Sequence, residues 1–344
     1  MKLISLFNHK GGVSKTTTTF NLGWMLAELG HKTLIVDADP QCNLTALVLD
    51  YNAVEDIEEF YKNNPRCDIF TGVKPVLDGS LEKIVSAEPI QTSNKKLFLL
   101  AGNIKLAEAE TQISVAITTS QAIPALQNIP GSFGELLRKT ASDKKFEFVL
   151  IDMSPSVGAL NEILLMTSDF FIVPTSPDFF CAQAIRSLTS VLPKWNNEIK
   201  KFRNKDKLTY PMPQVPPKFL GIISQKYRPR SGAPAKSFQR WIDEIKKMVD
   251  EHLIPALHSQ NMTIPREKFS EHVNADTPYN LANIADFNSL IAQSQKFNVP
   301  IFALTEKQIE QGGVILGNMK KSQESFKDVF KSLAESIEKL TKDV

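Results

Sequence analysis

A glycine-rich segment near the start of the chain constrains the fold more than any other feature. It reads Asn8-His-Lys-Gly-Gly-Val-Ser-Lys-Thr-Thr-Thr-Thr19, follows the apolar run 3–7 and precedes a helical pattern that ends at Gly30. In a strand–loop–helix unit, the free N–H groups and the positive end of the helix dipole face the loop, so an anion can bind there. The segment therefore predicts a phosphate-binding loop.

Four side chains or glycines of this loop suit a nucleoside triphosphate. Gly11 and Gly12 let the backbone approach phosphate oxygens closely. Lys15 can reach the terminal phosphates, and the Thr16 hydroxyl is placed to bind magnesium. A glycine turn with incidental lysines is the alternative, and the strand-then-helix context argues against it.

The spacing of the loop departs from the ordinary pattern G-x-x-x-x-G-K-[ST], which would need glycines where His9 and Ser14 stand. The order Lys10-Gly-Gly-x-x-Lys15-Thr16 instead resembles the deviant Walker A box of the ParA/MinD family of P-loop ATPases. The resemblance implies ATP and Mg²⁺ as cofactors, and a Lys10 that reaches across a homodimer to the partner's nucleotide. It implies nucleotide contacts from Lys10, Gly11, Gly12, Val13, Ser14, Lys15, Thr16 and Thr17.

Two acidic segments follow apolar runs farther along the chain. The run 33–36 ends at Asp37-Ala-Asp39-Pro-Gln, and the run 146–151 ends at Asp152. Parallel sheets place ligands at the carboxyl ends of their strands, and Asp152 fits a Walker B aspartate that holds magnesium through water. The resemblance implies that Asp37 lies near the metal and that Asp39 positions the attacking water. The predicted metal residues are thus Thr16, Asp37 and Asp152, and the catalytic residues are Lys10, Lys15 and Asp39.

Apolar runs and helical patterns alternate along most of the chain. We expect strands at about 3–7, 33–37, 97–100, 146–151, 170–174 and 219–224. Such alternation gives right-handed βαβ units, so the predicted fold is α/β, a doubly wound, mostly parallel sheet flanked by helices, of the P-loop NTPase type. No linker divides the chain, which predicts one domain over residues 1–344.

The pattern also predicts a helix over 182–192 that Pro193 ends, a basic Pro- and Lys-rich insertion over about 194–217, and an amphipathic helix over 235–253. Near the carboxyl end, Phe326, Val329, Phe330, Leu333, Ile337 and Leu340 share one helical face. MinD-like relatives bind membranes with such a helix, whereas ParA-like relatives dock it on the sheet. Acidic residues dilute the basic face, so we expect a docking helix over about 322–342.

Composition narrows the class of protein further. The 344 residues are 42% hydrophobic and 23% charged, as in ordinary globular proteins. Cys42, Cys67 and Cys181 form no C-x-x-C pair, which favours a reducing compartment and argues against an iron–sulfur cluster. No apolar run approaches the roughly 18–20 residues that span a bilayer. We therefore expect a cytoplasmic protein without a membrane partner.

Positive charge is concentrated in one part of the chain. Residues 194–247 contain fourteen Lys and Arg against four Asp and Glu, whereas the rest of the chain has a net charge of −8. A solvated face is one explanation; the other, typical of ParA relatives, is a track that binds DNA phosphates without sequence preference. The predicted DNA contacts are Lys226, Arg228, Arg230, Lys236 and Arg240. The phosphate loop begins within ten residues of the start, so we expect no preceding helix-turn-helix.

The resemblance implies a function as well as a fold. A ParA-like ATPase forms an ATP-dependent homodimer, binds DNA non-specifically, associates with the nucleoid and positions a plasmid, chromosome or other cargo, while a ParB-like partner stimulates its slow hydrolysis. Relatives place adenine contacts at positions that correspond here to Gln225 and Pro265. Two alternatives stay open: a MinD-like ATPase that cycles on membranes, and a nucleotide-dependent scaffold that hardly hydrolyses ATP.

Overall fold

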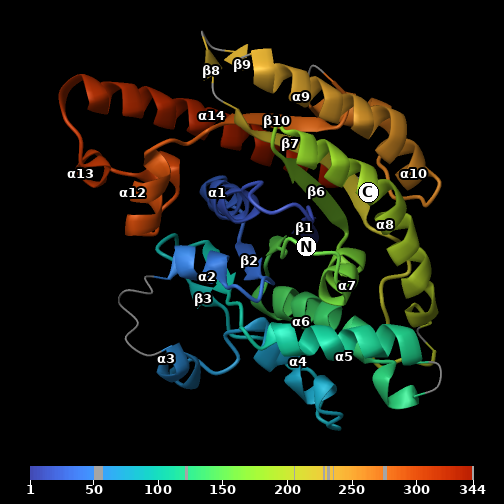
Figure 1. The fold of residues 1–344 in the computed structure, drawn as a ribbon. Helices are drawn as coiled ribbons and strands as arrows, with labels where there is room; N and C mark the ends of the chain where they lie inside the picture. The colour runs from blue at the N-terminus through green and yellow to red at the C-terminus, as the bar shows by residue number, and fades with distance from the viewer. Residues whose placement is uncertain are drawn as a thin grey trace.

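The computed structural model describes residues 1–49, 57–120, 123–204, 206–227, 229–230, 233–234, 236–273 and 277–342. Its centre is an eight-stranded sheet in the order β10-β7-β6-β1-β5-β2-β4-β3 (Figure 1), in which only the β3–β4 pair is antiparallel. The strands are β1 Lys2–Leu6, β2 Thr33–Asp37, β3 Ile90–Gln91, β4 Leu97–Leu100, β5 Phe148–Asp152, β6 Phe170–Thr175, β7 Lys218–Tyr227 and β10 Asn280–Ala285. The short strands β8 (Pro229–Arg230) and β9 (Ala233–Pro234) form a separate hairpin.

Helices cover both faces of the sheet (Figure 1). One group is formed by α1 and α14, which pack on each other, and α5 to α9 form a second group in which neighbours along the chain are in contact. The helices are α1 Lys15–Glu28, α2 Asn43–Val48, α3 Ile57–Asn63, α4 Ile69–Leu77, α5 Leu106–Thr119, α6 Ile129–Lys144, α7 Ala159–Thr167, α8 Phe179–Ile199, α9 Lys236–Met248, α10 Ile254–His258, α11 Arg266–His272, α12 Leu290–Phe297, α13 Glu306–Ile309 and α14 Gly313–Lys342. The predicted doubly wound α/β fold is confirmed.

The central strands are buried on both faces, which explains why they are apolar almost throughout. Every residue of β2, β5 and β6 is buried. A parallel strand covered by helices on both sides cannot alternate polar with apolar residues. The polar residues therefore appear where these strands end, and the carboxyl ends of β1, β5 and β2 lie together because Leu6 and Asp37 both pair with Asp152.

The six expected strands are present. The two-residue strands β3, β8 and β9 were not expected, and neither was the longer β10. Its sequence, Asn280-Leu-Ala-Asn-Ile-Ala285, contains two asparagines and two alanines, and only one of its residues is β-branched. Such residues have low strand propensity, so the segment has no clear strand signal. It becomes a strand because β7 offers it a parallel edge along residues 222–227.

The prediction that Pro193 ends a helix is wrong. Helix α8 continues through Pro193 to Ile199, so the first residues of the predicted 194–217 insertion are helical. Proline costs one backbone hydrogen bond within a helix. Burial of Leu192, Trp195 and Ile199 holds this helix against the core nevertheless, and the Trp195 ring lies 5.4 Å from that of Phe7.

The C-terminal helix α14 begins at Gly313, before the predicted start at about 322. Its apolar face packs on α1 and β10. The buried residues of that face include Phe326, Phe330, Leu333, Ile337 and Leu340. Within the described ranges, no helix combines the length and apolarity that a bilayer span needs.

Burial of the α14 face gives a first prediction. Phe330 is fully buried and stacks near Phe287, with ring centroids 6.4 Å apart. Phe330→Ala should lower the free energy of unfolding by about 3–5 kcal/mol, because it removes a packed ring and leaves a cavity. The exposed Lys331 on the same helix is the control, and Lys331→Ala should change stability by less than about 0.5 kcal/mol. Equal effects of both changes in urea denaturation would show that α14 is not part of the core.

Candidate nucleotide-binding site

The loop between β1 and α1 bends through two left-handed residues, Gly12 with φ 75° and Ser14 with φ 59°. The Ser14 side chain does not cap α1. The N–H groups of the first turn are therefore available to a ligand, as the sequence predicted for a phosphate loop. The left-handed conformation costs a non-glycine residue about 1–2 kcal/mol, which Ser14 bears where the ordinary pattern has glycine.

A cavity of about 640 Å³ opens at this loop. That volume lies within the usual range for small-molecule sites. The lining residues come from the phosphate loop, the segment after β2, α2, the segment after β5, the end of β7, the segment after β10, and α12. They are Gly12, Val13, Ser14, Lys15, Thr16, Thr17, Asp39, Asn43, Ala46, Leu47, Pro155, Lys226, Asp286, Phe287, Ile291 and Gln295. The predicted contacts from Gly12 to Thr17 thus line one cavity, whereas Lys10 and Gly11 lie outside its lining.

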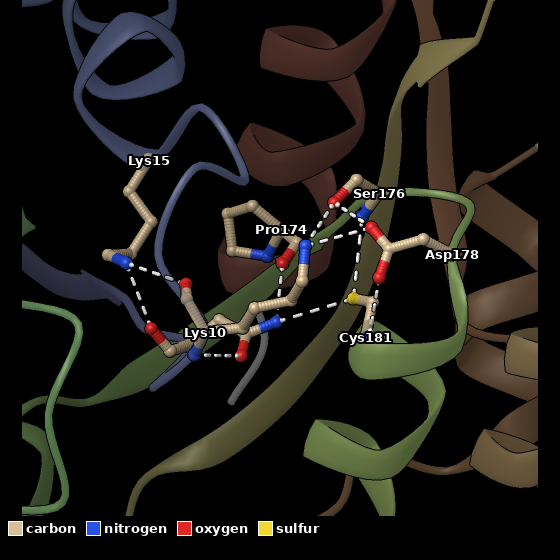
Figure 2. Close-up of polar contacts among 7 residues, drawn as sticks. Lys10, Lys15, Pro174, Ser176, Asp178 and Cys181 are labelled. Carbon is tan, nitrogen blue, oxygen red and sulfur yellow. Dashed lines mark hydrogen bonds and ion pairs between the residues drawn. The ribbon is translucent and has the colours of Figure 1, made fainter.

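Lys15 is buried in the loop and held by its backbone. Its Nζ donates to the carbonyl oxygens of Asn8 at 2.9 Å and Lys10 at 3.4 Å (Figure 2). Burial lowers the pKa of Lys15, and the nearby carboxylates of Asp152 and Asp39 act in the opposite direction. The ammonium group is therefore positioned to exchange two carbonyl oxygens for the oxygens of a phosphate.

Asp37 and Asp152 pair across neighbouring strands, and both are buried and lie outside the lining of the cavity. The Asp37 carboxylate accepts hydrogen bonds from the Thr45 N–H and hydroxyl, both at 2.7 Å, and from the Asp39 N–H at 3.2 Å. Burial nevertheless raises its pKa to about 6. Asp37 therefore fixes the position of α2 through Thr45, and it places a second acidic group beside Asp152.

Asp152 is not satisfied in the same way. Neither of its buried carboxylate oxygens has a hydrogen-bond partner among the residues that the structure describes. Burial raises its pKa to about 8, the Asp37 charge adds to this, and Thr16 and Lys15 lower it. A buried carboxylate with no partner, beside a threonine hydroxyl, has the donor chemistry that Mg²⁺ prefers. Asp152 and Thr16 thus fit the predicted metal site.

Asp39 follows the same strand as Asp37 and lines the cavity. It is buried, and its Oδ1 accepts a hydrogen bond from the Gln41 N–H at 2.9 Å. This bond fixes the carboxylate just before α2, so that it faces the same cavity as Lys15. Asp39 is thereby placed where it can contact a ligand of the phosphate loop.

Lys10 points away from the cavity in this structure. Its Nζ forms an ion pair with Asp178 at 2.8 Å and donates to the Ser176 hydroxyl at 3.2 Å (Figure 2). Asp178 also caps α8 by accepting from the Cys181 N–H. Burial raises the pKa of Asp178, but the bonds from Lys10 and Cys181 outweigh it, and the pKa lies below its ordinary value. Lys10 is thus held within its own chain.

The two predicted adenine contacts do not line the cavity. Gln225 is buried and donates to the Thr18 hydroxyl at 2.8 Å. Pro265 lies near the opposite end of the sheet, because the neighbouring Thr263 pairs with Phe219 at the start of β7. The cavity is formed at the carboxyl ends of the strands, so Pro265 is on the wrong side.

The wall opposite the phosphate loop comes from residues that the sequence did not single out. Asp286 and Phe287 directly follow β10, and Ile291 and Gln295 lie on α12. Asn43, Ala46 and Leu47 of α2 form another part of the lining. The Asn298 side chain, at the end of α12, connects α12 to α2 by donating a hydrogen bond to the Leu47 carbonyl at 2.9 Å. Recognition of β10 as a strand would have found this wall, since its carboxyl end adjoins that of β7.

The predicted DNA contacts fall in different places. Lys226 lines the nucleotide cavity, whereas Arg240 lies on α9 with its guanidinium 6.0 Å from the Trp241 ring. Arg228 lies outside the described residues, and so do the side chains of Arg230 and Lys236. Lys194 lies near the end of α8 and Lys200 in the turn that follows it, so both are far along the helix from the end of β6 at which the cavity opens. Several lysines of the basic segment 194–247 have partners: Lys194 lies 3.9 Å from Glu198, and Lys201 donates to the Ile117 carbonyl.

A phosphate loop after the first strand of a parallel sheet and a buried acidic pair beside its lysine define a P-loop nucleotide-binding protein. Comparison with known proteins agrees. The family model described as "AAA domain" matches residues 1–205. The chain belongs to this family and is a P-loop ATPase of the ParA type.

Individual relatives cover much of the chain. It is 29% identical over 268 residues to an uncharacterised protein of Methanocaldococcus jannaschii, which is 78% of this chain and 87% of the relative. It is also 29% identical over 195 residues to the sporulation initiation inhibitor protein Soj of Bacillus subtilis, which is 56% of this chain and 64% of the relative. The structure of pNOB8 ParA bound to nonspecific DNA has the same fold, with a TM-score of 0.60, 19% identity, and 100% of this chain and 99% of that chain covered.

The unpaired Asp152 gives a pH-dependent prediction. Its pKa of about 8 in the folded protein exceeds the ordinary 3.8, so the folded state binds a proton that the unfolded state has lost. The contribution of Asp152 to the free energy of unfolding therefore falls as the pH rises between these two values. Asp152→Asn removes this penalty, and its stability relative to the wild type should increase from about pH 5 to about pH 8. Urea denaturation of the nucleotide-free proteins at both pH values measures the difference, and a pH-independent difference would contradict the assignment.

Proposed function

We propose that the protein is a ParA-like ATPase that binds ATP with Mg²⁺, forms a nucleotide-sandwich homodimer and then binds DNA without sequence preference. A ParB-like adaptor stimulates its slow hydrolysis, and the cycle positions a plasmid, chromosome or other cargo in the cytoplasm, on the nucleoid while ATP is bound. One observation carries this proposal: the buried Asp152 carboxylate lies beside Lys15 and Thr16, and these two residues line a cavity of nucleotide size. Membership of the ParA type and a relative named Soj support it.

The residues of the chain divide the chemistry among them. Mg²⁺ neutralises phosphate charge when it is bound, and Asp152 and Thr16 are the residues that would hold it. Lys15 leaves the Asn8 and Lys10 carbonyls to contact the terminal phosphates. Asp39, which lines the same cavity just before α2, orients the attacking water. Catalysis of this kind depends on positioning and on stabilisation of developing charge.

Two features bear on the partners. The apolar face of α14 is buried against α1 and β10, which supports a ParA-type docked helix over a MinD-type membrane anchor. Arg240 belongs to α9, which follows β7 at the carboxyl edge of the sheet, whereas Lys226 lines the nucleotide cavity. A sandwich dimer brings two such edges together, so DNA would meet basic residues of both protomers.

Asp39 provides the test of hydrolysis. Asp39→Asn retains an oxygen that can accept from the Gln41 N–H, but it weakens the interaction with water. ATP binding should be preserved, while turnover falls by about 10²-fold if positioning of the water dominates. Phosphate release with and without DNA, together with titration of a fluorescent ATP analogue, measures both quantities. Unchanged turnover would remove Asp39 from the reaction, and loss of ATP binding would give it a structural role.

The Lys10–Asp178 ion pair provides the test of dimerisation. If Lys10 crosses to the partner's nucleotide, one such pair breaks in each protomer. A partly exposed pair stabilises by about 0.2–1 kcal/mol, so Asp178→Asn should strengthen ATP-dependent dimerisation by roughly 2- to 30-fold. Asparagine can still cap α8, so the helix should stay intact.

Asp68→Asn is the matched control, because Asp68 caps α4 in the same way through the Thr71 N–H. Analytical ultracentrifugation with ATP gives the dimerisation constant of each variant. Dimerisation that is weaker in Asp178→Asn than in Asp68→Asn would show that the ion pair does not restrain Lys10.

A further inference from the structure

A single buried amide closes the loop between β5 and α7. Residues 153–158, here called the β5–α7 loop, lead from Asp152 to the first turn of α7. Asn161 lies in that turn and is fully buried. Its Nδ2 lies 2.9 Å from the carbonyl oxygens of Ser154 and Ser156 and 3.0 Å from both of their hydroxyls. The Asn161 amide therefore bridges the two serines on either side of Pro155.

Pro155, which lies between the two bridged serines, contacts the nucleotide site. Pro155 lines the cavity, and a Cβ added at Gly11 would lie 3.8 Å from the Pro155 Cβ. Asp152 is two residues before Ser154. The conformation of the loop therefore determines both the approach to the phosphate loop and the chain direction directly after the metal carboxylate.

The first turn of α7 is anchored from outside the loop. Its N-cap, Gly158, has no side chain to satisfy the first N–H groups. Glu110 of α5 supplies the acceptor instead, and its Oε2 receives the Leu160 N–H at 3.0 Å. A carboxylate at this end of a helix also complements the helix dipole. Asn161 thus belongs to a turn that the neighbouring helix holds in place, and the loop is tied to that turn.

We infer that Asn161 is a positioning residue for ATP hydrolysis, which holds the β5–α7 loop in the arrangement that shapes the phosphate end of the site. This role rests on the proposed ATPase function. The two N–H bonds of the Asn161 side-chain amide are shared among four acceptor oxygens of Ser154 and Ser156. The buried Asn161 Oδ1 has no hydrogen-bond partner in the described part of the chain. An unsatisfied buried acceptor is unfavourable. A shift of the loop that turns a serine hydroxyl toward Oδ1 satisfies it, so the same amide can hold a second arrangement when nucleotide binds.

Hydrogen exchange tests whether Asn161 holds the loop, independently of any activity. In the nucleotide-free protein, Asn161→Ala should speed backbone amide exchange within residues 154–158 by about tenfold or more, because the loop opens locally once its tie is removed. The control is Asn196→Ala, since Asn196 of α8 is also a buried amide. It donates a hydrogen bond to Gln260 at 3.0 Å and accepts one from Arg203 at 2.7 Å. Exchange in 154–158 that is unchanged, or equally raised by the control, would overturn the inference.

Kinetics test whether the loop matters for hydrolysis. Asn161→Ala should lower kcat by about tenfold or more and change the KM for ATP by less than about threefold, because the contacts of the Lys15 loop are left intact. Asn161→Leu fills the same space without the donor and carries both tests if the alanine variant does not fold. Parallel changes of kcat and KM, or a loss of kcat no larger than that of Asn196→Ala, would contradict a positioning role. A wild-type protein without ATPase activity would contradict the proposed function, whereas hydrogen exchange would still decide whether Asn161 holds the loop.

Discussion

The site depends on two buried carboxylates that the parallel register of β2 and β5 places side by side. Asp37 and Asp152 are partners across these strands, and burial raises the pKa of one to about 6 and of the other to about 8. Hydrogen bonds from Thr45 and the Asp39 N–H stabilise Asp37. The ionised form of Asp152 is stabilised only by the neighbouring Lys15 charge and by Thr16 among the described residues. An acidic pair of this kind is stable at neutral pH with a proton or with a cation, and the proposed reaction uses the cation.

The order of the strands explains how one edge of the sheet can hold all the groups of the site. β1 lies between β6 and β5, so the phosphate loop emerges between Asp178 on one side and the β5–α7 loop on the other. β2 adjoins β5 and delivers Asp39 to the same cavity. At the far side, β10 adjoins β7. Phe287, two residues after β10, packs on Phe326 of α14 with ring centroids 4.8 Å apart. The C-terminal helix therefore supports the cavity wall that faces the phosphate loop.

The sequence predicted the parts of the site that are encoded locally. The phosphate loop, Asp37, Asp39 and Asp152 each follow an apolar run within a few residues, so a short pattern identifies them. The wall formed by β10 and α12 depends on a strand of low propensity that pairs far along the chain, and a local pattern cannot show this. The predicted adenine contacts Gln225 and Pro265 do not line the cavity, whereas residues that follow β10, the strand beside β7, do. The ion pair between Lys10 and Asp178 joins residues that are 168 positions apart, so no local sequence pattern indicated it.

The central claim is that burial raises the pKa of Asp152 in the nucleotide-free protein, and that Mg²⁺ takes the place of a proton there when ATP binds. Calorimetric titration of Mg²⁺–ATP at about pH 7, in buffers of different ionisation enthalpy, measures the protons released on binding. Because burial raises its pKa, Asp152 should release a proton in at least part of the molecules on binding, and Asp152→Asn should release fewer protons than the wild type. Equal proton release by the two proteins would contradict the account, because Asp152 would then be ionised before the ligand arrives.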